Sequence, residues 1–202
     1  MNEALLERAR KLAAGGRAVL GITGPPGAGK TTLAEALVRG LGAGVAHVPM
    51  DGFHLADAEL HRLGLRHRKG APETFDPWGY AAVLRRVREG TDEIVYAPGF
   101  ERTLEQPIAG AIPVPRSTRL VVSEGNYLLL DEPPWTAVRA AFDEVWYVDL
   151  DRAERMRRLV RRHVKFGKDE AAAIAWAGGT DERNAVRIAA TRERADLVIT
   201  SD

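Results

Sequence analysis

The sequence predicts an α/β fold with a doubly wound parallel sheet of five strands, flanked by helices. Short apolar runs rich in Val, Leu and Ile alternate with helical segments along the 202 residues. This order is typical of parallel strands that are covered on both faces. A glycine-rich turn also stands between the first apolar run and a helix. The length suffices for one well-buried domain and is short for two, so we expect residues 1–202 to form a single unit.

Five apolar runs are the candidate strands of this sheet. They barely alternate between apolar and polar residues, as expected for strands that are buried on both faces. In chain order they cover residues 18–23, 45–50, 119–123, 144–149 and 195–200. Two further runs, residues 93–96 and 108–114, are joined by a segment that contains Pro and Gly. We expect these two runs to form a small hairpin-like β excursion outside the main sheet.

Helical patterns fill the segments between these runs. Asp76 and Pro77 provide an N-cap and a proline at the first helical position, and Gly90 ends the helix that they begin. Asp151 caps another helix. The remaining helices are expected in residues 1–14, 31–39 and 181–194.

The glycine-rich turn fits the pattern G-x-x-x-x-G-K-[ST], the phosphate-binding P-loop, and it lies between a strand and a helix as that loop must. Its glycines allow main-chain N–H groups to face a polyphosphate. Lys30 can reach β- and γ-phosphate oxygens, and the Thr31 hydroxyl can bind Mg²⁺. The alternative is a turn that binds nothing. We expect ATP and Mg²⁺ as cofactors, with these nucleotide-binding residues: Gly24, Pro25, Pro26, Gly27, Ala28, Gly29, Lys30, Thr31 and Thr32.

Two carboxylates follow apolar runs of the expected sheet. Parallel α/β sheets bind ligands at the C-terminal edge of their strands. We therefore expect Asp51 to face the γ-phosphate and to accept a proton from a substrate hydroxyl. Glu124 is the candidate acid for Mg²⁺, and its length favours contact through a water molecule. The alternatives are that Asp51 caps a turn with Gly52 and that Glu124 only tethers a loop.

Residues 152–168 hold six arginines and two lysines but one acid. Charge runs are usually solvated helix faces, which is the alternative interpretation here. Arg158, Arg161 and Arg162 stand at positions i, i+3 and i+4, so they form one cluster, and a glycine breaks the segment soon after. We expect a helical lid over residues 152–170 that brings Arg158 and Arg162 to the triphosphate as catalytic groups and excludes water.

The substrate side of the site is expected in residues 52–115. This segment is basic and polar around residues 66–76, and an exposed loop without a ligand is the alternative there. The candidate substrate-binding residues are Asp51, His54, Arg68, Lys69, Arg102 and Tyr127.

The composition disfavours several classes of partner. The net charge is +1 and the basic residues concentrate in the expected lid, so we expect no nucleic-acid partner. The chain has no cysteine, which excludes disulfides and suits a reducing cytosol, and we expect a cytoplasmic location. No apolar run approaches the length of a membrane span, so no membrane partner is expected. The oligomeric state is left open, with a homodimer among the options.

Four segments resemble the phosphoribulokinase/uridine kinase group of P-loop kinases, which also contains bacterial type I pantothenate kinase. They are residues 24–32, 50–54, 68–76 and 123–130. The chain is most similar overall to members labelled nucleoside/nucleotide kinase or fructose-transport-system kinase. The resemblance implies that Asp51 is the catalytic base, Glu124 the Mg²⁺-linked acid and residues 158–168 the lid. Asn184 falls in a C-terminal signature of these members, without an assigned role.

The chain departs from the group in three places. Uridine kinases usually carry Asp-Phe-Tyr where residues 51–53 are Asp-Gly-Phe, which disfavours uridine as the substrate. Pantothenate kinases of this type are considerably longer, so part of their pantothenate-binding elements is missing here. Glu101 stands where relatives tend to have Asp, and recognition of the acceptor in the β excursion is expected to differ.

Taken together, the residues and the resemblance predict an ATP:alcohol phosphotransferase. Such a small-molecule kinase moves the γ-phosphoryl group of ATP to a hydroxyl of a nucleoside, sugar or pantothenate-like acceptor. Lys30 and the lid arginines would stabilise the charge of a loose transition state. The alternative is a nucleotide-dependent switch or regulatory P-loop NTPase without small-molecule phosphotransfer. A guanine-specific Asn-Lys-x-Asp motif is absent from the sequence, which disfavours the GTPase version of that alternative.

Overall fold

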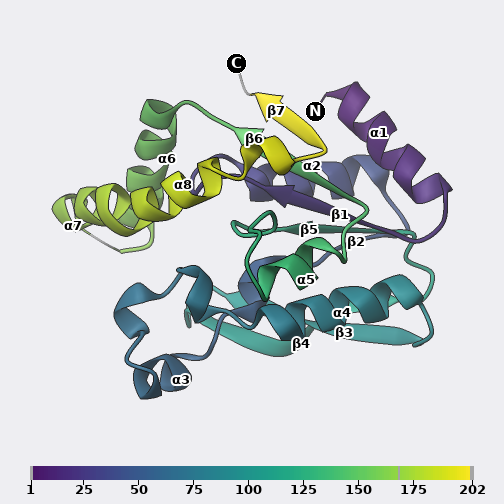
Figure 1. The fold of residues 1–202 in the computed structure, drawn as a ribbon, viewed down its shortest axis with the longest axis horizontal. Helices are drawn as coiled ribbons and strands as arrows, with labels where there is room; N and C mark the ends of the chain where they lie inside the picture. Colours follow the sequence, from purple (N-terminus) through teal and green to yellow (C-terminus); the bar gives the residue numbers. More distant parts are fainter. Residues whose placement is uncertain (1, 168, 201–202) are drawn as a thin grey trace.

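A five-stranded sheet forms the centre of the molecule (Figure 1). The computed structural model describes residues 2–167 and 169–200. The strand order is β2-β5-β1-β6-β7, and every pairing is parallel. The predicted doubly wound parallel sheet is therefore confirmed. Its strands are β1 Ala18–Thr23, β2 Val45–His47, β5 Leu120–Glu124, β6 Glu144–Asp149 and β7 Leu197–Thr200.

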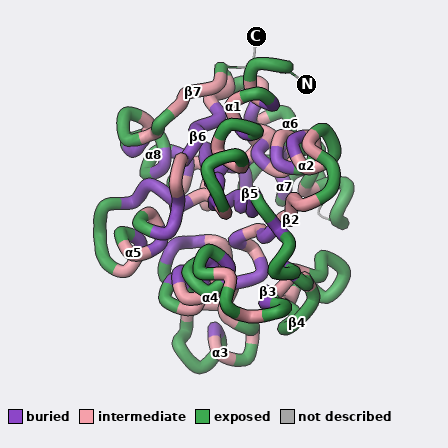
Figure 2. Tube along the Cα trace, turned by 90° about the vertical axis from the view of Figure 1, so that its right-hand side faces the viewer, coloured by how far each residue is buried: buried purple, intermediate pink, exposed green. Residues whose placement is uncertain are grey.

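Helices cover both faces of this sheet, because the side chains of a strand alternate between its two faces. Leu20 and Ile22 of β1 belong to a core under α1 and α2, whereas Val19 belongs to a core under α4 and α5. All six residues of β1 are buried, and Figure 2 shows the buried strands enclosed by more exposed helices. The four helices are α1 Glu3–Ala14, α2 Lys30–Leu41, α4 Pro77–Glu89 and α5 Trp135–Arg139.

Strand β2 is shorter than the sequence predicts. It ends at His47 instead of residue 50, although Val48 still donates its N–H to Val122 at 3.0 Å. Pro49 has no N–H group and cannot extend the ladder. The chain then turns into a short 3₁₀ helix, Met50–Phe53, and this turn places Asp51 beyond the C-terminal edge of the sheet.

The predicted β excursion is confirmed as an antiparallel hairpin of β3 (Ile94–Glu101) and β4 (Gln106–Pro115). Its strands are longer than the predicted runs. The hairpin packs closely on the Asp51 turn, since a Cβ built on Gly52 would lie 2.2 Å from the carbonyl oxygen of Pro98. Any larger residue at position 52 would push the hairpin away from Asp51.

The predicted lid, residues 152–170, begins with α6 (Arg152–Lys165) and ends at the start of α7 (Glu170–Trp176), which is followed by a π-helical turn (Ala177–Asp181) and α8 (Glu182–Ala189). Asp151 caps α6 as predicted, because its carboxylate accepts the N–H groups of residues 153 and 154 at 2.9 and 3.1 Å. The sequence did not predict α7, and the helix expected at 181–194 ends at residue 189. Lys168, within the predicted lid, lies outside the described residues.

Short elements lie between β2 and α4, in the segment predicted as the substrate side. They are the helix α3 (Asp57–Arg62) and three 3₁₀ turns, Met50–Phe53, Arg66–Arg68 and Pro72–Thr74. Asp76 caps α4 as predicted, accepting the N–H of Gly79 at 2.8 Å. Within residues 2–167 and 169–200, no helix combines the length and the apolarity that spanning a bilayer requires.

Candidate active site

The glycine-rich loop packs against α6 and the end of β6. Gly24, Gly27 and Gly29 have φ angles of +143°, +85° and +97°, which favour glycine. A Cβ on Gly24 would lie 2.4 Å from the oxygen of Val148, and one on Gly27 would lie 2.9 Å from the oxygen of Arg155. The loop therefore keeps its main chain close to α6 and leaves its N–H groups at the start of α2.

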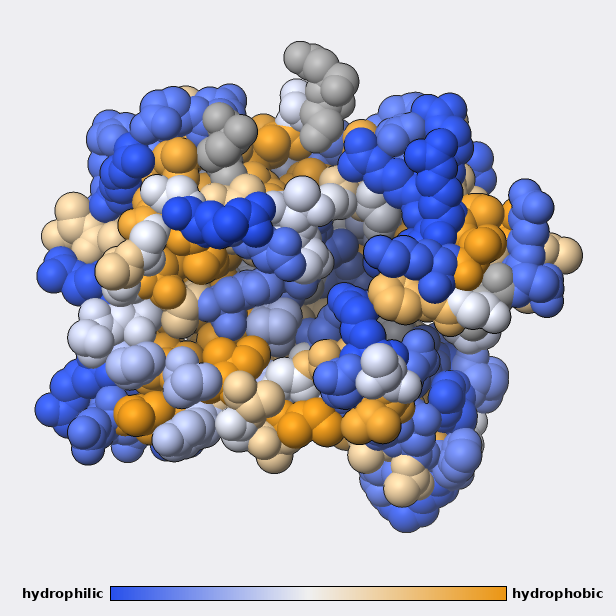
Figure 3. All heavy atoms as spheres, turned by 180° about the vertical axis from the view of Figure 1, so that it is seen from behind, coloured by the Kyte–Doolittle hydropathy of each residue, from blue (hydrophilic) through white to orange (hydrophobic). Residues whose placement is uncertain are grey.

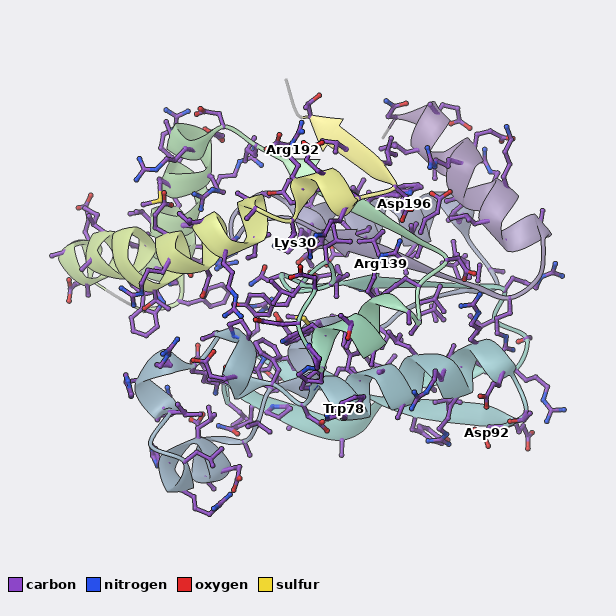
Figure 4. All side chains as sticks on the ribbon, in the orientation of Figure 1. Lys30, Trp78, Asp92, Arg139, Arg192 and Asp196 are labelled. Carbon is purple, nitrogen blue, oxygen red and sulfur yellow. The ribbon has the colours of Figure 1, made fainter. Side chains whose placement is uncertain are left out.

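Lys30 occupies the first position of α2 and is buried, near the centre of the molecule (Figure 4). Its Nζ donates hydrogen bonds to the carbonyl oxygens of Gly24 at 2.9 Å and Pro25 at 3.2 Å. Burial lowers the pKa of Lys30 to about 8, an effect that the nearby carboxylate of Glu124 partly opposes. An arriving phosphate would stabilise the charged ammonium, so this lysine is prepared for an anion.

Thr31 and Glu124 form a pair of oxygen donors beside Lys30. The Thr31 hydroxyl donates to Glu124 Oε1 at 3.0 Å. Burial raises the pKa of Glu124 to about 7, with a further contribution from the charge of Asp51. A divalent cation would favour the ionised carboxylate, and hard cations prefer such oxygens. In the described part of the chain, no three His, Cys, Asp or Glu side chains lie close enough together to hold a metal ion. Nucleotide oxygens would therefore have to complete the coordination of Mg²⁺.

Asp51 faces the same cavity as the P-loop. The cavity has a volume of about 400 Å³, and its lining includes Lys30, Thr31, Asp51 and Glu124. Among the described residues, no main-chain N–H of the following turn donates a hydrogen bond to the Asp51 carboxylate, so the turn-capping alternative receives no support. Its nearest cation is Arg102, whose Nη2 lies 3.7 Å from Asp51 Oδ2.

The cavity is lined by α6 and by the segments that include Lys69 and Arg102. Seen from behind, the surface is hollowed between the block that carries α6 and α7 and the block that carries α3, and hydrophilic side chains gather around the hollow (Figure 3). Of the two predicted catalytic arginines, Arg162 lines the cavity. Arg158 pairs with Glu154 at 2.8 Å, and its Nη1 lies 3.6 Å from a Cβ built on Gly29. The structure therefore brings Arg158 close to Gly29 of the P-loop and Arg162 to the lining of the cavity.

Three of the candidate substrate-binding residues besides Asp51 line the cavity, namely His54, Lys69 and Arg102. Lys69 also pairs with Asp57 at 2.6 Å. The other two candidates lie elsewhere. Arg68 pairs with Glu73 at 2.6 Å, outside the lining residues that the structure describes.

Tyr127 is fully buried in the core, where its hydroxyl donates to the carbonyl oxygen of Gly70 at 2.5 Å. Its ring lies edge-on to Phe75 and Trp135. These contacts place Tyr127 behind the cavity wall. A substrate contact by Tyr127 or Arg68 therefore has no geometric support, in contrast to the residues that reach the cavity.

Sequence reasoning missed several residues of the site. Arg155, one member of the charge run, is buried and contacts the P-loop at Pro26. Asn184 lines the cavity, and its Nδ2 lies 3.4 Å from the oxygen of Gly70. Further lining residues that were not named as site residues include Arg66, Phe75, Phe100, Asn126, His163, Phe166 and Trp176. The sequence carried a signal for some residues of the site: Phe75 and Asn126 lie in two of the segments that carry the family resemblance, and Asn184 lies in its C-terminal signature.

Because the P-loop, Asp51 and Glu124 share one cavity on a five-stranded parallel sheet, the fold and the site define a P-loop kinase. A family model described as "Phosphoribulokinase / Uridine kinase family" matches residues 19–201. The chain therefore belongs to the phosphoribulokinase/uridine kinase family, and the resemblance found in the sequence is confirmed.

Individual relatives agree with this assignment. "Putative uridine kinase C227.14" of Schizosaccharomyces pombe is 33% identical over 160 residues, which cover 75% of this chain and 68% of that protein. "Pantothenate kinase" of Leifsonia xyli subsp. xyli is 32% identical over 212 residues, covering 91% of this chain and 66% of the relative. A crystal structure of a "putative fructose transport system kinase" from Silicibacter sp. TM1040 has a TM-score of 0.86 at 38% identity, covering 98% of this chain and 99% of that one. These matches support small-molecule kinase activity.

Proposed function

We propose that the protein transfers the γ-phosphoryl group of ATP to a hydroxyl of a small alcohol. The observation that supports this proposal is the shared cavity, which Asp51 lines together with the P-loop residues Lys30 and Thr31. A switch protein needs the nucleotide site but has no use for a proton acceptor beside it. The cavity leaves room for an alcohol between the two.

The proposed reaction assigns one role to each of these groups. Asp51 accepts the proton of the attacking hydroxyl, whose oxygen forms a bond to the γ-phosphorus. The bond between that phosphorus and the β–γ bridging oxygen breaks, and ADP leaves with the electron pair. Lys30 and Arg162 stabilise the charge on the transferring phosphoryl group. When bound between Thr31, Glu124 and the nucleotide, Mg²⁺ would neutralise charge on the phosphate oxygens.

The names of the relatives indicate which classes of small alcohol could accept the phosphoryl group. A nucleoside, a sugar and a pantothenate-like alcohol remain the candidates. In this proposal, residues 52–115 form the acceptor side of one domain that spans the chain, and residues 152–170 form its lid. ATP preference over GTP, a cytoplasmic location and a homodimer stay predictions.

The test combines an acceptor screen with a matched pair of variants. ADP release with Mg²⁺-ATP is measured against a panel of nucleosides, sugars and hydroxy acids. We expect one class to stimulate release. Asp51→Asn should then lower kcat by about 10²-fold or more while the Kd for ATP changes little, and Lys30→Ala should abolish turnover. Asp92→Asn changes a half-buried carboxylate that pairs with Arg86 in the connection between α4 and β3, at the end of α4 away from the cavity (Figure 4), and should leave the rate unchanged.

Two results would count against this function. Near wild-type phosphorylation by Asp51→Asn would exclude Asp51 as the base. Nucleotide hydrolysis that no member of the panel stimulates would favour the nucleotide-dependent switch.

A further inference from the structure

His54 is held rigidly next to the proposed base. Its main chain forms an isolated antiparallel bridge with Phe75. Hydrogen bonds flank this bridge on both sides, from Leu55 N to Thr74 O at 2.9 Å and from Asp76 N to Phe53 O at 2.8 Å. The backbone of His54 is therefore fixed relative to the wall of the cavity.

The imidazole ring is also fixed. Its centroid lies 3.9 Å from that of Phe75 and 5.1 Å from that of Phe100. Its Nδ1 lies 2.9 Å from the main-chain oxygen of Asp51. Two aromatic contacts and one hydrogen bond leave the ring little rotational freedom, so the direction of its second nitrogen is determined by the fold.

The partner of Nδ1 determines which nitrogen carries the proton. A main-chain carbonyl oxygen can only accept a hydrogen bond, so Nδ1 of His54 must donate. Burial lowers the pKa of His54, although the charge of Asp51 opposes this effect. The ring is accordingly neutral at physiological pH, and Nε2 presents a lone pair that can only accept a hydrogen bond.

This Nε2 atom opens onto the cavity. Among the described residues it has no hydrogen-bond partner, and His54 is one of the cavity's lining residues. His47 provides the contrast. Among the side-chain nitrogen and oxygen atoms of residues 2–167 and 169–200, only His47 Nε2 is both fully buried and without a hydrogen-bond partner. His54 Nε2 also has no described partner but is not fully buried. It is therefore accessible from the cavity and available to a ligand.

We propose that His54 Nε2 accepts a hydrogen bond from a second hydroxyl of the acceptor, so that the substrate is a polyhydroxylated alcohol. This proposal rests on the proposed function, in which Asp51 takes the proton of the first hydroxyl. The two residues belong to one turn and line the same cavity, so one small molecule can reach both. A monohydroxylated analogue would leave the lone pair of His54 unpaired in a partly buried site, which disfavours binding.

The test uses two substitutions that separate the two ring nitrogens. His54→Asn retains a donor near the position of Nδ1 for the Asp51 carbonyl but has no group at the position of Nε2. His54→Gln extends its amide oxygen toward the position of Nε2. The acceptor with the highest kcat/KM in the screen is compared with analogues in which each remaining hydroxyl is replaced in turn by hydrogen. Thermal unfolding of both variants serves as the check that they fold.

The wild-type protein should prefer the intact acceptor over one deoxy analogue by about tenfold in kcat/KM. His54→Asn should lower kcat/KM for the intact acceptor by a similar factor and remove the preference, whereas His54→Gln should retain part of it. Unchanged discrimination by a folded His54→Asn protein would overturn this proposal and leave the kinase function standing. If no alcohol stimulates ADP release by the wild-type protein, the kinase function fails and this proposal fails with it.

Discussion

Arg155 donates a hydrogen bond from Nη1 to the main-chain oxygen of Pro26 at 3.2 Å, although 129 positions separate the two residues in the chain. Its Nη2 donates to Glu182 Oε2 at 2.6 Å. Burial alone would raise the pKa of the Glu182 carboxyl, but hydrogen bonds from Arg152 and Arg155 outweigh it and lower that pKa. One buried guanidinium thus joins the P-loop, α6 and α8.

This connection predicts that Arg155→Met destabilises the protein. The substitution keeps much of the side-chain volume but leaves Pro26 O and Glu182 Oε2 without the donor that Arg155 supplies, while Glu182 Oε1 keeps its bond from Arg152. Breaking such a buried pair typically lowers the free energy of unfolding by about 3 kcal/mol. Urea denaturation would measure the change, and a weaker Kd for ATP should accompany it. Arg157→Met is the matched control, since Arg157 pairs with Glu154 at the surface of the same helix, where ion pairs contribute little. Equal stability of the two variants would contradict the assigned role.

Tyr127 permits a prediction that distinguishes a core residue from a substrate contact. Tyr127→Phe removes the hydrogen bond to Gly70 O and retains the ring contacts with Phe75 and Trp135. We expect a loss of about 1 kcal/mol in the free energy of unfolding and an unchanged KM for the acceptor. Tyr96→Phe, on the exposed face of the hairpin, should change neither quantity. A raised KM for the acceptor at full stability would restore Tyr127 to the substrate site.

The parts of the site that lie close together in the sequence could be predicted from it. The P-loop motif lies within residues 24–31, and Asp51 and Glu124 each follow an apolar run directly. Their shared position requires only that the strands be parallel, and the structure has that sheet. The end of β2 was predictable too, because Pro49 lies in the sequence and has no N–H group for the ladder. The close packing of the hairpin on the Asp51 turn was not, because it depends on a contact between the distant residues Gly52 and Pro98.

The lid shows why the remaining features could not be predicted. Gly178 and Gly179 usually indicate the end of a helix, yet the chain continues through them as a π-helical turn. The hydrogen bond between His163 and Asp181, at 2.7 Å, joins this turn to α6. Likewise, the charge run does not reveal which arginine is buried, since Glu182 and the oxygen of Pro26 are distant in sequence from Arg155.

Because His47 Nε2 is buried without a hydrogen-bond partner among the described residues, we predict that the stability of the protein depends on pH. Burial lowers the pKa of His47 in the folded protein, whereas an unfolded histidine has a pKa of about 6.5. The unfolded chain therefore binds more protons below that pH, and the free energy of unfolding should fall as the pH decreases from about 7 toward 5. Urea denaturation at each pH would measure the slope. His47→Leu should reduce it, and His61→Leu, at an exposed position on α3, should retain it. An identical slope in wild type and His47→Leu would exclude His47 as the cause.

Arg161 and Arg162 are neighbours in the charge run, and the structure separates them. Both residues are exposed. Arg162 lines the cavity and its charge lowers the pKa of Lys30, whereas Arg161 is not among the described lining residues. Removing a group that stabilises charge in the transition state lowers kcat by about 10²-fold or more. We therefore expect Arg162→Ala to lower kcat by that factor in the ADP-release assay, with a smaller change in the KM for the acceptor, and Arg161→Ala to have almost no effect.

The two substitutions remove the same charge from the same helix, so a general loss of positive charge would affect both variants alike. Equal rates for the two variants would mean that the lid acts through its net charge and that Arg162 has no specific contact with the transferring phosphoryl group.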